Sequence, residues 1–104
     1  MSKRDDMRVV LSRMVHDALD QGYTLNVDNG GDRAELPRPS TSAQEVLDAM
    51  MATDDEHLLY HRDGRCVGWV WLIYSNDVCE MIADNTTNLE DILRGAMDIM
   101  EQYA

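Results

Sequence analysis

The segment Cys66–Tyr74 (CVGWVWLIY) decides the fold of this 104-residue chain. It is the longest uninterrupted apolar run, it contains both tryptophans, and it is rich in the β-branched and aromatic residues that favour strands. Turn-forming residues border it, with Asp63-Gly64 before it and Ser75-Asn76-Asp77 after it. A bilayer span needs about 20 residues, so the segment is too short for one. It predicts a central strand with apolar side chains on both faces.

Strand-forming segments lie on both sides of this central strand. Leu58–Tyr60 precede it, and residues 78–84 follow it. Folding the chain about the two turns would place Tyr60 opposite Val67 and Met81 opposite Trp71. The three segments together predict an antiparallel sheet.

This pairing would give the sheet two apolar faces. The more uniformly apolar face would hold both tryptophans, and we expect helices to cover it, although the pattern leaves open which face they cover. His57, His61 and Glu80 dilute the second face, which is still too apolar to be ordinary solvated surface and predicts a contact surface. The predicted contact residues are Val70, Leu72, Tyr74, Glu80, Ile82 and Asp84.

Three other segments predict helices. Residues 5–21 repeat apolar side chains at i, i+3, i+4 and i+7, and Gly22 follows at the usual stop position. Ser42–Glu45 and Thr87–Glu90 are capping boxes, in which the two outer side chains satisfy free amides at the start of a helix. They predict a short helix that ends near Ala52 and a final helix that begins at Thr87.

A hairpin is predicted between the first two helices. Tyr23, Leu25 and Val27 alternate with polar residues, and Asn29-Gly30 is the strongest short hairpin signal. Residues 34–36 would form the second arm, with Leu25 opposite Ala34 and Tyr23 opposite Leu36. The resulting order α-β-β-α-β-β-β-α predicts an α+β fold in one domain, residues 1–104, with a two-layer architecture: a mostly antiparallel sheet with helices on one face.

The chain is strongly acidic, with a formal net charge of -11. Residues 1–38 hold seven acids and six bases, whereas residues 39–104 hold thirteen acids and three arginines. Such a field opposes direct binding to nucleic acid or to an anionic membrane. It favours a protein partner with a basic surface, or serves solubility alone, which is the more common role of such a charge.

Cysteine and histidine usage offers little chemistry. Cys66 and Cys79 are too few for a disulfide framework, and the amphipathic N-terminal segment does not resemble a signal peptide, so we expect a cytoplasmic protein. His57, His61 and Cys66 could form a metal cluster, but their spacing fits no common zinc pattern. No cofactor, metal or catalytic residue is predicted.

Three stretches of the C-terminal half, residues 67–70, 73–77 and 82–91, resemble a block in small uncharacterised proteins of phages and prophages of Gram-negative bacteria. In this chain they include Val67-Gly68-Trp69-Val70 and Ile82-Ala83-Asp84-Asn85. The resemblance implies no activity and no cofactor. It implies a small accessory protein that acts in the cytoplasm of a bacterial host.

The expected function is therefore non-enzymatic: binding and modulating a host or phage protein. A first alternative is a nucleic-acid mimic that inhibits a DNA-binding or defence enzyme, which the acidic residues 39–104 would permit. A second is a small metal-dependent enzyme that uses the His57/His61/Cys66 cluster. The second sheet face could also bury itself in a homodimer.

Overall fold

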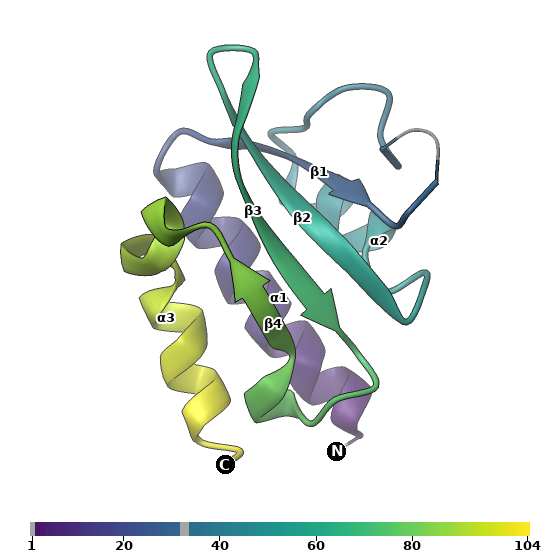
Figure 1. Ribbon diagram of the computed structural model, residues 1–104, viewed down its shortest axis with the longest axis vertical. Helices are drawn as coiled ribbons and strands as arrows, with labels where there is room; N and C mark the ends of the chain where they lie inside the picture. The colour runs from purple at the N-terminus through teal and green to yellow at the C-terminus, as the bar shows by residue number, and fades with distance from the viewer. Residues whose placement is uncertain (1, 32–33) are drawn as a thin grey trace.

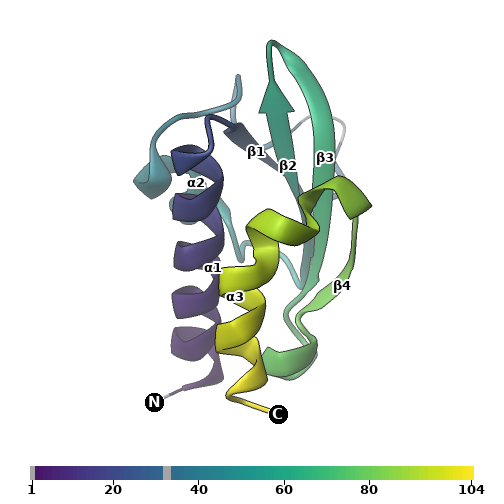
Figure 2. The same ribbon diagram turned by 90° about the vertical axis from the view of Figure 1, so that its left-hand side faces the viewer.

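Residues 2–31 and 34–104, which the computed structural model describes, form a four-stranded antiparallel sheet with three α-helices against one of its faces (Figures 1 and 2). Figure 2 shows the two layers from the side, with the helices on one side of the strands. In chain order the elements are α1 (Lys3–Asp20), β1 (Thr24–Asp28), α2 (Ala43–Ala49), β2 (Asp55–Arg62), β3 (Arg65–Ile73), the 3-10 helix η1 (Val78–Glu80), β4 (Ile82–Asn85), the 3-10 helix η2 (Thr87–Leu89) and α3 (Glu90–Glu101). The strands are ordered β1-β2-β3-β4.

The predicted α+β fold is confirmed, and the decisive segment forms β3, one residue earlier than expected at each end. Asp63 and Gly64 have φ values of 53° and 77°. Positive φ at both central residues is what a type I′ turn requires, and this turn suits the twist of a hairpin. The turn that joins β2 to β3 was therefore predicted correctly.

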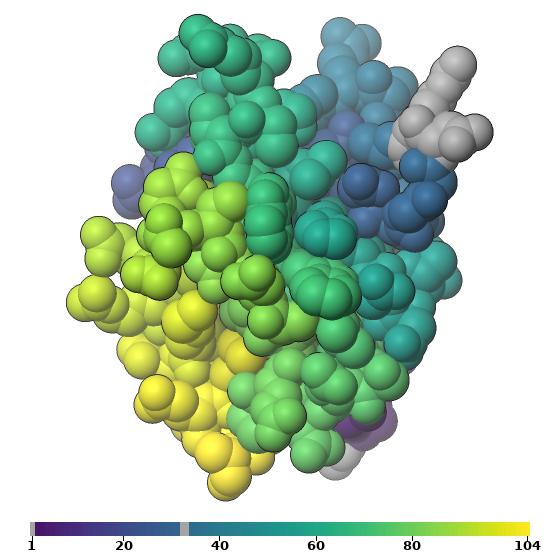
Figure 3. All heavy atoms as spheres, viewed as in Figure 1, coloured from purple at the N-terminus to yellow at the C-terminus, as the bar shows by residue number. Residues whose placement is uncertain are grey.

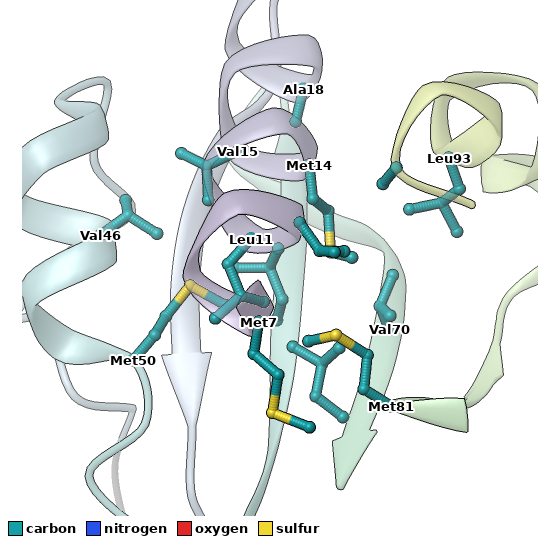
Figure 4. Close-up of a cluster of buried hydrophobic side chains, with 14 of the residues drawn as sticks. Met7, Leu11, Met14, Val15, Ala18, Val46, Met50, Val70, Met81 and Leu93 are labelled. Atoms are coloured by element: carbon teal, nitrogen blue, oxygen red, sulfur yellow. The ribbon is translucent and has the colours of Figure 1, made fainter. Parts of the chain in front are cut away.

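Helix α1 packs its apolar stripe onto the sheet between α2 and α3 (Figure 4). Val46 and Met50 of α2 approach it on one side, and Leu93 of α3 lies on the other. A fully buried valine, leucine or methionine side chain contributes about 1.5–3 kcal/mol relative to an exposed one. The buried stripe of α1 therefore makes a large contribution to the stability of the fold. The buried residues of α1 are Met7, Val10, Leu11, Met14, Val15 and Ala18.

The pairing of β2 with β3 differs from the prediction by one residue. Tyr60 pairs with Gly68 rather than with Val67, and a register irregularity follows at Tyr60/His61. Successive side chains of a strand point to opposite faces, so a one-residue change exchanges the two faces of β3. Val70 and Leu72 consequently lie in the core, fully buried, and Trp71 lies on the face without helices.

The first predicted hairpin is only partly right. The chain does return antiparallel beside β1, but residues 34–36 form no strand, and Leu25 pairs with Ser40 instead of Ala34. The Asn26 side chain replaces the missing ladder: its Oδ1 accepts from the Leu36 N–H at 3.0 Å, and its Nδ2 donates to the Leu36 carbonyl at 3.0 Å. Strand β1 pairs on its other side with β2, which the sequence pattern did not indicate.

The segment predicted as one strand over residues 78–84 divides into η1 and the four-residue β4. Trp71 therefore pairs with Asp84 rather than with Met81. The predicted capping box at Thr87–Glu90 is also wrong, because η2 occupies its first three residues and no side chain caps α3. The neighbouring Thr86 hydroxyl instead accepts a hydrogen bond from the Trp69 N–H at 3.1 Å.

Candidate functional site

The sheet face that the described helices leave uncovered carries both tryptophans of the chain. Trp69, Trp71 and Ile73 of β3 lie there beside His57 and Leu59 of β2, and all five side chains are partly exposed. Figure 3 views the molecule from this side, with the teal and green side chains of the sheet at its centre and α3 to one side. We call these five residues the aromatic face. Exposed apolar groups gathered in one place mark interaction surfaces.

Contacts within the aromatic face hold its rings in place. The His57 ring stacks on Trp71 with 5.8 Å between centroids and 5° between planes, and it meets Trp69 edge-on at 5.5 Å. Aromatic pairs of this kind contribute about 0.5–1.5 kcal/mol beyond their buried area. The Trp71 Nε1–H also donates to Asp55 Oδ2 at 3.2 Å. The face is thus ordered in advance, which lowers the entropic cost of binding.

Carboxylates lie beside these rings on three strands. The register aligns Asp28, His57, Trp71 and Asp84 in one row across all four strands. Asp55 pairs with Ile73 in the next row. We call Asp28, Asp55 and Asp84 the acidic flank. A partner that covers the aromatic face would therefore meet negative charge on both sides of it.

Basic residues are nearly absent from the described strands. The sole examples are Arg62 and Arg65 at the hairpin tip. Arg62 points away from the aromatic face: its guanidinium lies 4.0 Å from the centroid of the Tyr23 ring and donates to the Gln21 carbonyl. Neither of these arginines forms an ion pair with a carboxylate of the acidic flank.

The residues predicted to form the contact surface are distributed differently. Val70 and Leu72 are fully buried and Tyr74 is 8% exposed, so the centre of the predicted surface lies in the core. The physical reason is the register of β3, which turns these side chains toward the helices. Ile82 is partly exposed and packs against the core, whereas Glu80 and Asp84 are exposed. Of the six, Asp84 is the one that lies on the uncovered face beside the tryptophans.

The three residues considered as a metal cluster do not converge. His61 pairs with Cys66 across the hairpin, and the Cys66 thiol donates weakly to the Gly68 carbonyl at 3.5 Å. His57 lies four residues away along β2 and stacks on Trp71. Within residues 2–31 and 34–104, no group of three or more His, Cys, Asp or Glu side chains is placed to hold a metal ion.

A buried carboxylate that the sequence did not predict joins β2 to the end of β3. Glu56 is 1% exposed, and each of its two carboxylate oxygens lies 3.1 Å from the backbone nitrogen of Met51 and accepts from its N–H. Met51 itself has a positive φ of 67°. Oε2 also accepts from the Tyr74 hydroxyl at 2.5 Å. Burial raises the pKa of Glu56, and the hydrogen bonds from Tyr74 and Met51 oppose this change. The arrangement ties three separate backbone segments together.

Tyr60 offers a contrasting case and a testable prediction. Its side chain is fully buried, burial raises the pKa of its hydroxyl, and that oxygen has no hydrogen-bond partner among the described residues. A buried polar group without a partner costs about 1–3 kcal/mol. Tyr60→Phe keeps the edge-on contact with Tyr23 (5.5 Å between centroids). We expect this variant to raise the free energy of unfolding by about 1 kcal/mol in urea denaturation, and a loss of stability would show that the hydroxyl has a partner.

A polar cleft of about 480 Å³ lies where the end of α1 meets the start of β1 and the beginning of α3. Its two arginines already have partners: Arg13 Nε lies 2.8 Å from Asp17 Oδ2, and Arg62 contacts Tyr23. A cation near the last carbonyls of a helix stabilises that helix end. The cleft is therefore accounted for by contacts that stabilise the C-terminal end of α1. Sequence reasoning could not find it, because its lining comes from three separate segments: residues 13–23, Arg62 and residues 88–95.

No family model, curated protein or solved structure matches this chain. Over the part of the chain that the structure describes, none of the helices has both the length and the apolar character that crossing a membrane requires.

Proposed function

We propose that this chain is a small, non-enzymatic accessory protein that binds and modulates another protein through the aromatic face. One observation carries the proposal: both tryptophans contact His57 and are nevertheless partly exposed, on the sheet face that the described helices leave uncovered. Aromatic residues are enriched at the centres of protein interfaces and contribute most of their binding energy. The acidic flank supports a partner with a basic surface, and the resemblance of residues 67–70, 73–77 and 82–91 supports a phage or host protein.

Replacing Trp71 by serine tests this proposal. Immobilised wild-type protein should retain a stoichiometric partner from a bacterial lysate, and that partner can then be purified and titrated against each variant. Truncating a central tryptophan of an interface typically costs about 2 kcal/mol or more, which corresponds to a roughly 30-fold weaker affinity. We expect Trp71→Ser to weaken binding by about this factor while circular dichroism shows an unchanged fold.

Val9→Ser is the matched control. Val9 is 47% exposed on α1, in the opposite layer, so this variant also removes an exposed apolar side chain from the surface. The control should bind the partner with wild-type affinity. Equal affinities for wild type, Trp71→Ser and Val9→Ser would contradict the assignment of binding to the aromatic face.

Light scattering of the free protein separates hetero-association from self-association. We expect the wild-type chain to have the mass of a monomer, because pairing two copies through this face would bring their acidic flanks together. A dimer that Trp71→Ser converts to a monomer would show that a second copy, and not another protein, covers the aromatic face. Charged substitutions at Leu72 would not answer this question, because that side chain lies in the core.

A further inference from the structure

The aromatic face and the acidic flank together define the chemistry of a ligand. Two partly exposed indoles lie beside three carboxylates, and His57 stacks on one ring face of Trp71. Neither arginine of the described strands forms an ion pair with these carboxylates. An indole face attracts cations through its ring quadrupole, and carboxylates attract them through their charge. The two attractions act here at one place.

We infer that the partner inserts an arginine side chain onto this surface, with its guanidinium over an indole of Trp69 or Trp71 and its N–H groups toward the acidic flank. This inference rests on the proposed protein-binding function and specifies the partner's chemistry. A guanidinium suits the site better than an ammonium, because it is planar, stacks on aromatic rings and donates two parallel hydrogen bonds to a carboxylate.

The carboxylates retain acceptor capacity for such a ligand. Asp28 Oδ1 accepts from the Gly30 N–H at 2.9 Å, and Asp84 Oδ1 accepts from the Asn85 N–H at 2.9 Å. These bonds orient each carboxylate, while the second oxygen of each has no hydrogen bond from the described part of the protein. Asp55 is held in the same way by the Trp71 Nε1–H through Oδ2.

The chain itself contains this kind of contact at another place. The Arg62 guanidinium lies 4.0 Å from the centroid of the Tyr23 ring and donates to the Gln21 carbonyl. The inferred contact would repeat this combination of stacking and hydrogen bonding between two proteins. Other occupants fit less well. The net charge of -11 would repel an anionic ligand, and in a dimer formed through this face the acidic flanks of the two copies would repel each other.

Tryptophan fluorescence provides a direct test, because both indoles of the chain lie on this face and no other tryptophan contributes. Three peptides of the same length serve as probes: one of arginine, one of lysine, and one of citrulline, the uncharged analogue of arginine. At about 0.15 M salt, where long-range attraction is screened, we expect a saturable fluorescence change with the arginine peptide. The lysine peptide should bind roughly 3- to 10-fold more weakly, and the citrulline peptide should not bind measurably.

Variants locate the binding. Asp28→Asn with Asp84→Asn should weaken binding of the arginine peptide roughly 10-fold, since both carboxylates attract the cation and the one that the guanidinium contacts also forfeits a charge-assisted hydrogen bond. The control, Asp98→Asn with Glu101→Gln, changes the net charge equally on α3, where both residues are exposed. Equal losses in the two double variants would show diffuse charge attraction and overturn the inference.

The peptides and the partner distinguish two kinds of failure. Equal binding of the arginine and citrulline peptides, or no binding of any peptide while Trp71→Ser still releases the protein partner, would overturn the arginine inference alone. A partner that is retained equally by wild type and Trp71→Ser would overturn the proposed function itself.

Discussion

Glu56→Ala is expected to lower the free energy of unfolding by about 3 kcal/mol, because it removes the acceptor of two buried donors. The Met51 N–H and the Tyr74 hydroxyl would both lose their hydrogen bonds to the carboxylate. Each unsatisfied buried group costs about 1–3 kcal/mol. Urea denaturation followed by circular dichroism measures the loss. Tyr74→Phe is the partial control: it removes one donor with its bond, and we expect it to cost about 1 kcal/mol.

The pH dependence of stability should separate the charge of Glu56 from its hydrogen bonds. Burial raises the folded-state pKa of this carboxyl above its ordinary value of 4.5, so the folded chain binds the proton more tightly than the unfolded chain does. Protonation of Glu56 therefore stabilises the folded state fully below pH 4.5, and this stabilisation is lost as the pH rises through the raised pKa of the folded state.

The side chain in Glu56→Gln cannot ionise but keeps an acceptor oxygen. This variant should therefore not lose stability as the pH rises through the pKa of Glu56. The free energy of unfolding of Glu56→Gln minus that of wild type should increase as the pH rises from about 4 to about 8. Wild type and Glu56→Gln contain the same other carboxylates, so the contributions of those groups to the pH dependence cancel in the difference between the two free energies. A constant or decreasing difference would show that the folded state does not raise the pKa of Glu56.

Gly68→Ala is expected to cost about 2 kcal/mol, within the usual range for overpacking a core. An added Cβ would lie 2.7 Å from Thr86 Oγ1 and 3.0 Å from both Cγ and Cδ1 of Leu89. Leu89 is fully buried, so its branched end has little room to move. Alanine is not expected to strain the backbone here, because Gly68 is not among the glycines with positive φ.

Gly95→Ala is the matched control for Gly68→Ala. Its added Cβ would lie 2.6–2.9 Å from atoms of the Arg13 guanidinium, which is the mobile end of a long, partly exposed side chain. Alanine also gains about 1 kcal/mol over glycine within a helix. We expect the stability of this variant to stay within about 1 kcal/mol of wild type. Equal losses at the two positions would contradict the packing explanation for Gly68.

The contrast between β1 and β3 shows how much of the fold the sequence could predict. In β1 the apolar Leu25 and Val27 alternate with polar residues, so the buried face follows from the pattern, and both side chains are fully buried. In β3 nearly every residue from 66 to 74 is apolar, so the segment predicts a strand but not which side chains point inward. Packing between residues distant in sequence distinguishes the two faces: Gly68 lies on the covered face, where its missing side chain leaves room for Leu89, 21 positions later in the chain.

The residues of the candidate site were also hard to predict, because the sequence of β3 does not show which of its side chains point toward the helices. The prediction that a second, uncovered apolar face exists agrees with the structure, but the residues of β3 assigned to it were those of the core. Trp69 and Trp71 were expected beneath helices because the predicted register placed them on the more uniformly apolar face. The buried contact of Glu56 with Tyr74 also escaped prediction, since it joins residues that no local pattern links.

The Asn26 side chain has a consequence for how the protein behaves at high concentration. Its Oδ1 accepts from the Val27 N–H, and the Val27 carbonyl accepts from the Glu35 N–H. Ser40 pairs with both backbone groups of Leu25, so these hydrogen-bonding positions along the outer edge of β1 are occupied. The opposite edge of the sheet is the four-residue β4, too short to be a long template for another chain. Within the described residues, neither edge of the sheet offers a long unpaired template for strand addition, so we expect concentrated solutions of the protein to resist cross-β aggregation although both tryptophans are partly exposed.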